Sequence, residues 1–199
     1  MGKKRAFYDK KDHSKVIGEY YKLFDRYDGT NAKSIKNQLI RLIQKDPYFL
    51  DSYLLLYEVL RDEKDFEEAE RVLDEAYKKA MELITDKNDK WPDILEWGWL
   101  ENRHIIRTIL NKAISLWENN HMDEALNLFR NLLKTNPNDN VGARYYILAI
   151  RMNMSLEKFE KRFDRGGYHD NELPQWFERN YKKFPDEFDW WEKAIKNYE

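Results

Sequence analysis

The chain has 199 residues, which suits one compact domain or one continuous array of repeats. Hydrophobic residues make up 42% and charged residues 36%, so the composition excludes a disordered chain and a membrane span. The 35 basic and 37 acidic residues leave a net charge of −2, without the basic excess expected of a duplex nucleic-acid binder. Because cysteine is absent, disulfides, thiol catalysis and cysteine-bound zinc are excluded.

The chain begins with a locally basic stretch, a basic N-terminal arm over residues 1–13. The cations of this arm are Lys3, Lys4, Arg5, Lys10 and Lys11, and Lys15 follows shortly after it. Such an arm could contact phosphate, or it could be a solvated terminus. The N-terminus lacks the apolar segment of a secretory signal, and no run is long enough for a transmembrane helix. We therefore expect a soluble, cytoplasmic protein.

Only 7 glycines and 5 prolines interrupt the chain, which favours long helices over a β fold. Residues 16–83 show two helix-turn-helix patterns, with Pro47 ending the first pattern. Asp65 and Glu68 have the spacing of a capping box, which predicts a helix over 66–85.

An insertion over 84–105 separates these patterns from the next ones. Pro92 suits the first position of a helix, and no strong helix-breaking signal follows before Asn119. We therefore predict one long helix over 92–119. Gly98 inside that helix predicts a close helix crossing. Trp97 and Trp99, with Trp117 further along, form either an aromatic shelf for a peptide or a packing surface.

Two further helix pairs are predicted over 106–173, and the pattern is clearest between Ile106 and Asp139. There, Ala113 and Ala125 would allow two helices to approach closely, and Phe129 would fill the space between neighbouring pairs. Pro137 would end the second helix. This arrangement resembles the tetratricopeptide repeat (TPR), whose repeats are about 34 residues long.

The resemblance implies an all-α fold, a right-handed helix-turn-helix solenoid of about four TPR-like repeats. Residues 16–83 would form repeats one and two, and residues 106–173 would form repeats three and four. The extended helix pair would lie around the insertion, and residues 174–199, with Pro174 and Pro185, would form a C-terminal capping helix pair. The whole chain, 1–199, would be a single domain.

No pattern predicts catalysis or a metal. The four histidines, at 13, 104, 121 and 169, have no metal-ligand spacing, and no glycine-rich phosphate loop or serine elbow occurs. The carboxylate runs are typical of solvated helix faces. We therefore expect no enzyme activity, no cofactor and no metal.

The resemblance also implies a concave groove that binds a segment of a partner. Carried onto this sequence, the groove residues are Tyr20, Phe24, Leu54, Arg103, Arg107, Trp117, Arg144 and Arg151. Arg103, Arg107 and Arg144 could converge on a carboxylate or phosphate. Alternatively, glutamates within the fold, such as Glu96, Glu101 or Glu118, satisfy them.

The main hypothesis is thus a non-catalytic protein-interaction module or scaffold. The partner would be another protein or a peptide segment, with no membrane involved. Replacing Arg107 or Arg144 with alanine would then weaken binding of the partner and leave the fold intact. The alternative is a nucleic-acid-associated protein that uses the basic arm and the groove arginines, and its binding would fall steeply with salt. A third possibility is self-assembly through an uncapped end.

Overall fold

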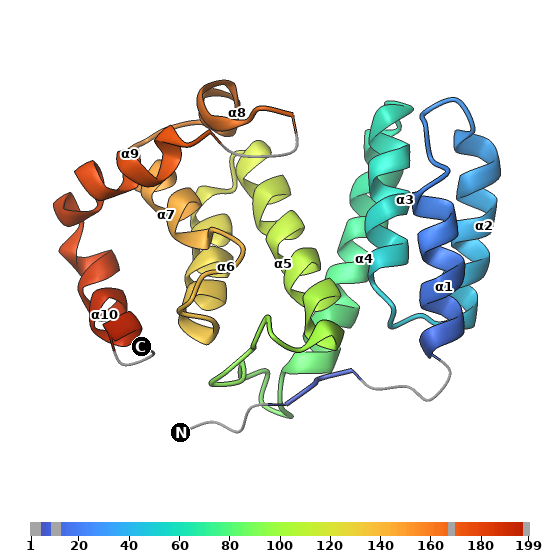
Figure 1. Cartoon of the computed structure of the whole chain (residues 1–199), viewed down its shortest axis with the longest axis horizontal. Coiled ribbons are helices and arrows are strands. Elements are labelled where there is room, and N and C mark those ends of the chain that lie inside the picture. The colour runs from blue at the N-terminus through green and yellow to red at the C-terminus, as the bar shows by residue number, and fades with distance from the viewer. Residues whose placement is uncertain (1–4, 9–12, 167–169, 197–199) are drawn as a thin grey trace. The chain divides into compact units, whose positions relative to one another are not determined.

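The computed structural model describes residues 5–8, 13–166 and 170–196, and for residues 13 and 14 it describes the backbone only. Ten α-helices, one 3₁₀ helix and no β-strand occur in this part of the chain (Figure 1). The all-α prediction is therefore confirmed, whereas the solenoid and the number of repeats stay predictions. The described residues of 4–92 and 96–112 form one compact unit, here the N-terminal unit. Those of 93–95 and 113–199 form the C-terminal unit.

The N-terminal unit is built from helices of which the first four contact one another in chain order, and an ion pair of Lys112 with Asp74 joins the last one to the fourth. They are α1 (His13–Phe24), α2 (Ala32–Lys45), α3 (Asp51–Asp62), α4 (Phe66–Ile84) and the first part of α5 (Leu100–Glu118). Gly29, with φ of 79°, supports the turn between α1 and α2. The core contains Leu39, Val59 and Leu73, each fully buried. Apolar residues at helical spacing thus put one face of each helix in this core.

Helix α4 matches the predicted helix over 66–85 closely. The Asp65 side chain accepts a hydrogen bond from the Glu68 backbone N–H, which satisfies one of the free donors at the helix start. The buried face of α4 then repeats every three or four residues, at Ala69, Leu73, Ala76, Ala80 and Ile84.

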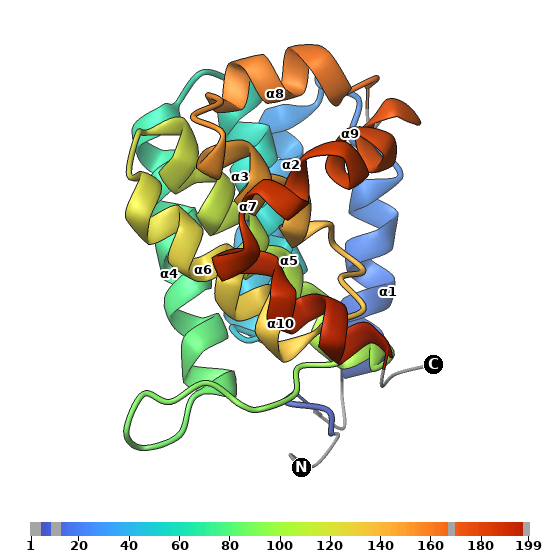
Figure 2. The same ribbon diagram turned by 90° about the vertical axis from the view of Figure 1, so that its left-hand side faces the viewer.

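The C-terminal unit contains the end of α5 and six further elements. They are α6 (Met122–Thr135), α7 (Ala143–Arg151), α8 (Leu156–Phe163), α9 (Glu172–Asn180), the 3₁₀ helix η1 (Tyr181–Lys183) and α10 (Pro185–Lys196). Helix α9 contacts α7, and α10 is joined to α6 by an ion pair of Arg130 with Glu187 (Figure 2). Helices are thus present where Pro174 and Pro185 predicted them.

Large aromatic side chains fill the core of the C-terminal unit. Phe129 stacks on Tyr146 with ring centroids 5.0 Å apart, and Phe159 lies 5.1 Å from Phe163. Trp117 is 1% exposed and its ring lies 5.7 Å from that of Phe159. Such edge and stacked contacts add to the free energy gained from burial alone.

The predicted start of the long helix at residue 92 is wrong, because α5 begins only at Leu100. Leu95 is fully buried and its backbone N–H donates to the Thr135 carbonyl at 2.9 Å. The Asn102 side chain donates to the Glu96 carbonyl at 3.1 Å. Burial and hydrogen bonds outside a helix therefore hold this segment, and the expected close crossing at Gly98 is also wrong, because nothing lies within 4 Å of a Cβ built there.

The described part of the N-terminal arm lies on the N-terminal unit. The Phe7 backbone N–H donates to Asn102 Oδ1 at 2.8 Å, and Asn102 Nδ2 donates to the Arg5 carbonyl at 3.1 Å. Tyr8 is buried and its hydroxyl donates to Asp46. The predicted phosphate contacts of the arm fall mostly outside the described residues, since these exclude Lys3, Lys4, Lys10 and Lys11.

Candidate functional site

Four of the predicted groove residues line one cavity of the N-terminal unit. It has a volume of about 250 Å³ and is lined by residues of α1, α3 and α5. We call it the α1–α3–α5 cavity. The residues that line it are Tyr20, Tyr21, Phe24, Asp51, Leu54, Leu55, Glu58, Arg107 and Asn111. Tyr20 and Leu54 are mostly buried, whereas Tyr21 is 53% and Phe24 51% exposed.

Arg107 is held by a carboxylate of the fold. Its Nε donates to Asp51 Oδ1 at 3.1 Å and its Nη2 donates to Asp51 Oδ2. The Asp51 side chain is 8% exposed and that of Arg107 is 38% exposed. Arg103, one turn earlier, donates from Nε to the Trp97 carbonyl at 3.1 Å and lies over the Trp97 ring. Arg107 is therefore paired with a carboxylate, whereas Arg103 is held by one backbone carbonyl and by the Trp97 ring, which packs against it.

Replacing Arg107 with alanine is expected to lower the free energy of unfolding by about 1–3 kcal/mol, because Asp51 would lose a bidentate partner in a largely buried position. This replaces the sequence-based expectation of an intact fold. Arg107→Lys keeps the charge but not the two parallel hydrogen bonds, so an intermediate loss is expected. Hydrogen exchange of the α3 amides measures the effect, and exchange unchanged from wild type would contradict it.

Glu58 is the second carboxylate of the α1–α3–α5 cavity. It is exposed, and it makes no hydrogen bond or ion pair with any residue that the structure describes. The pKa of Glu58 is raised mainly because neighbouring protein atoms partly desolvate its carboxylate. The negative charges of Asp62 and Asp51 raise this pKa further. No neighbouring cation therefore stabilises its negative charge.

The remaining predicted groove residues belong to the C-terminal unit, and there they are structural. Arg144 Nη1 donates to Asp139 Oδ2 at 2.8 Å, and its guanidinium lies 4.2 Å from the Tyr145 ring centroid. Arg151 pairs with Asp186 at 2.7 Å and also with Glu187. The prediction that Trp117 lines the groove is wrong, because its ring is buried in the core.

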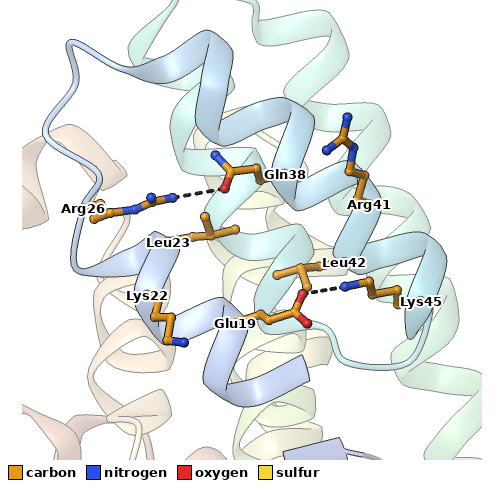
Figure 3. Close-up of a pocket in the computed structure, with 8 residues that line it drawn as sticks. All are labelled: Glu19, Lys22, Leu23, Arg26, Gln38, Arg41, Leu42 and Lys45. Carbon is orange, nitrogen blue, oxygen red and sulfur yellow. Dashed lines mark hydrogen bonds and ion pairs between the residues drawn. The ribbon is translucent and has the colours of Figure 1, made fainter. Parts of the chain in front are cut away.

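A second cavity of the N-terminal unit lies between α1 and α2 and has a volume of about 280 Å³ (Figure 3). Its lining, here called the α1–α2 basic groove, is Glu19, Lys22, Leu23, Arg26, Gln38, Arg41, Leu42 and Lys45. Four cations thus surround a single carboxylate. Lys45 Nζ pairs with Glu19 at 2.6 Å, and Arg26 donates to the neutral Gln38 amide at 3.1 Å.

The other two cations of the α1–α2 basic groove carry free charge. Within the described ranges, Lys22 and Arg41 have no hydrogen-bond or ion-pair partner, and both are exposed. None of these groove residues is among those predicted from the sequence, because the resemblance placed binding on the concave face only. Part of the signal was present: Arg41 and Lys45 are four residues apart on α2 and so share one face of that helix, whereas Lys22 is on α1 and Arg26 lies two residues beyond its end.

The described residues contain no group of three or more histidine, aspartate or glutamate side chains that could hold a metal ion. No helix among them has both the length and the apolar character needed to span a bilayer. Of the histidines whose side chains the structure describes, His104 is buried in α5 and His121 pairs with Glu124.

The fold and these surfaces define an all-helical protein whose exposed features are a basic groove and an acidic, aromatic cavity. The chain belongs to the family described as Tcf25, transcriptional repressor TCF25, whose model matches residues 8–165. That range extends from the N-terminal segment through α8. No curated protein and no solved structure matches the chain.

The family match overturns the assignment to the TPR family, because the matching model is Tcf25 and no TPR model matches. The residues behind the resemblance have a general packing role. Ala113 and Ala125 are fully buried, as small residues are wherever two helices approach closely. Pro137 follows the end of α6, as proline does after many helices. These residues therefore indicate packed helix pairs, not one particular repeat family.

Proposed function

We propose that this chain is a transcription-associated protein that contacts nucleic acid through the α1–α2 basic groove. The description of its family as a transcriptional repressor supports a role in transcription and a nuclear location rather than the cytoplasmic one expected from the sequence. The observation that carries the contact is the excess of four cations over one carboxylate in this groove.

The charge of the groove is available to a ligand, unlike that of Arg107 and Arg144, which were named from the sequence. Arg107 and Arg144 each pair with a carboxylate that is at most 8% exposed, so neither offers free charge. Lys22 and Arg41 are exposed and have no partner among the described residues. Arginine binds phosphate oxygens through two parallel N–H donors, and lysine adds a point charge. The groove therefore suits a phosphate backbone.

The size of the cationic cluster sets the expected strength. Each phosphate neutralised on duplex DNA contributes about −0.9 to the slope of log affinity against log salt, and about −0.7 on a single strand. Contacts from Lys22, Arg26 and Arg41 would thus give a slope of about −2 to −3. The contact would be weak and independent of base sequence, since phosphate contacts position a protein without reading bases.

Replacing Lys22 and Arg41 together with alanine is expected to weaken binding of a labelled oligonucleotide about tenfold and to reduce the salt slope by about 2, because each cation contacts one phosphate. Fluorescence anisotropy between about 50 and 200 mM salt, with duplex DNA, single-stranded DNA and RNA, measures both quantities. The substitutions fall on exposed side chains, so the fold should be unchanged.

The matched control replaces two exposed lysines of the C-terminal unit, Lys158 and Lys193, with alanine. It removes two positive charges, as the groove variant does. An equal loss of affinity in this control would contradict a specific role of the groove. A separate variant with alanine at Lys3, Lys4, Lys10 and Lys11 tests the basic arm. If the full chain binds none of the three nucleic acids at low salt, the proposal fails.

A further inference from the structure

The α1–α3–α5 cavity has an uncompensated negative charge. Asp51 and Glu58 face one cation, Arg107, and Arg107 is already bound to Asp51 through two hydrogen bonds. Glu58 has no hydrogen bond or ion pair with the residues that the structure describes. The Asp62 carboxylate adds to the negative potential around it. A cationic group is therefore the ligand that this charge favours, and a phosphate would be repelled.

The rim of the same cavity presents aromatic rings to solvent. Tyr21 and Phe24 are one helical turn apart on α1, and each exposes about half of its surface. Behind them, Tyr20 lies with its ring centroid 6.1 Å from that of Phe24. The face of an aromatic ring attracts a cation, and a guanidinium can also stack on it. Exposed aromatic groups beside an unpaired carboxylate are the two components that bind such a group.

The size of the cavity suits a group as small as one side chain. Its volume of about 250 Å³ is below the range of about 300–1,000 Å³ of sites that enclose a drug-sized molecule. Leu54 and Leu55 provide an apolar wall that suits the methylene stem of a long side chain. Arginine combines this stem with a planar cation that matches a carboxylate and an aromatic face.

We infer that the α1–α3–α5 cavity binds an arginine side chain presented by an exposed segment of a partner protein. The guanidinium pairs with Glu58 and packs on Tyr21 and Phe24, while its stem lies against the two leucines. This interaction goes beyond the proposed contact with nucleic acid, because it uses a different surface of opposite charge and does not depend on the α1–α2 basic groove.

The test uses the full chain and a capped pentapeptide, Ala-Ala-Arg-Ala-Ala, with the methyl NMR signals of Leu54 and Leu55 as reporters. We expect saturable shifts with a dissociation constant on the order of millimolar, as befits one partly exposed cation–π and ion-pair contact. The matched peptide with glutamine in place of arginine should give no saturable shift. A lysine peptide should bind more weakly than the arginine peptide.

Two variants separate this site from general electrostatics. Glu58→Gln is expected to weaken the arginine peptide about fivefold through loss of the ion pair, and Phe24→Leu about threefold through loss of the ring face. Both side chains are exposed, so the fold should remain. Glu157→Gln, at an exposed carboxylate of α8 outside the cavity, is the control and should leave the affinity unchanged.

Four results would overturn the inference. The first is an arginine peptide that gives no saturable leucine shift, and the second is a glutamine peptide that gives the same shift. The third is an oligonucleotide that shifts these methyl groups and whose binding is weakened by Phe24→Leu, which would assign the cavity to a nucleobase. The fourth is a shift that depends on protein concentration without peptide, which would assign the cavity to a second copy of the chain. The first, second and fourth results leave the anisotropy experiment untouched. The third would also place a nucleic-acid contact in the cavity, and the Lys22 and Arg41 variant tests separately whether the α1–α2 basic groove contributes to that binding.

Discussion

Replacing Trp117 with alanine is expected to lower the free energy of unfolding of the C-terminal unit by about 3–5 kcal/mol. The ring is 1% exposed, and its centroid lies 5.7 Å from that of Phe159 and 6.2 Å from that of Tyr146. The variant loses this buried area and leaves a cavity that the surrounding helices fill only partly. Urea denaturation, followed by hydrogen exchange of the α6 and α7 amides, measures the loss.

The matched variant Trp117→Phe retains most of the ring. The indole N–H of Trp117 is buried and has no hydrogen-bond partner within the described part of the chain, so its removal relieves one unsatisfied donor. The loss should therefore be well below that of alanine. Phe24→Ala, at another predicted aromatic groove position, should change stability by about 0.5 kcal/mol or less, since Phe24 is half exposed. Equal losses at residues 117 and 24 would contradict the assignment of Trp117 to the core.

Replacing Glu187 with alanine is expected to lower the free energy of unfolding by about 2–4 kcal/mol. Its side chain is 7% exposed and bridges Arg130 of α6 and Arg151 of α7, with Arg130 Nε at 2.9 Å from Oε2. Removal of the carboxylate leaves two arginines that repel each other and removes the ion pairs that join α10 to α6 and, through Glu187, to α7. Both arginines are partly exposed and can rehydrate, which keeps the loss below the upper limit for buried pairs.

The control for Glu187 is Asp186→Asn. The Asp186 side chain is 61% exposed and pairs only with Arg151 among the described residues, so a loss of about 0–1 kcal/mol is expected. Thermal denaturation of both variants at neutral pH gives the comparison. A smaller effect at residue 187 than at residue 186 would show that the bridge does not anchor α10.

The same bridge predicts how stability depends on pH. Burial alone would raise the pKa of Glu187, but the hydrogen bonds from Arg130 and Arg151 outweigh burial and lower it below its ordinary value of 4.5. The carboxylate therefore stabilises the folded state above that value, and its contribution is lost as the pH falls through the lowered pKa. Glu187→Gln should lack this part of the acid destabilisation.

Local signals in the sequence were sufficient for much of the helical structure. The capping pair Asp65 and Glu68 correctly located the start of α4, because a cap depends on atoms that are neighbours along the chain. Pro185 likewise located the start of α10. The start of α5 was predicted wrongly, because Leu95 is held by the distant Thr135 carbonyl, which no local pattern reveals.

The candidate sites could be predicted only in part from the sequence. The positions of Tyr20, Phe24, Leu54 and Arg107 around one cavity agree with the groove hypothesis, but binding there stays a prediction. The sequence is compatible with either free or internally paired arginines, and the structure pairs Arg107 with Asp51 and Arg144 with Asp139. Arg107 and Asp51 are 56 residues apart and are brought together only by helix packing, so sequence spacing could not identify that pair. Asp139 and Arg144 are five residues apart at the start of α7, so theirs is a local contact.

The sequence by itself determined that the chain is helical, because hydrophobic periodicity along the chain reflects local backbone structure. It also excluded thiol chemistry for this chain, because the chain has no cysteine. Its small residues and prolines also indicated packed helix pairs, but they did not identify the family. Only the tertiary structure decided which charges are free, since Lys22, Arg41 and Glu58 differ from the paired arginines in their spatial neighbours alone. A side chain's availability for binding depends on the carboxylates and cations that folding places beside it, and this information is not local.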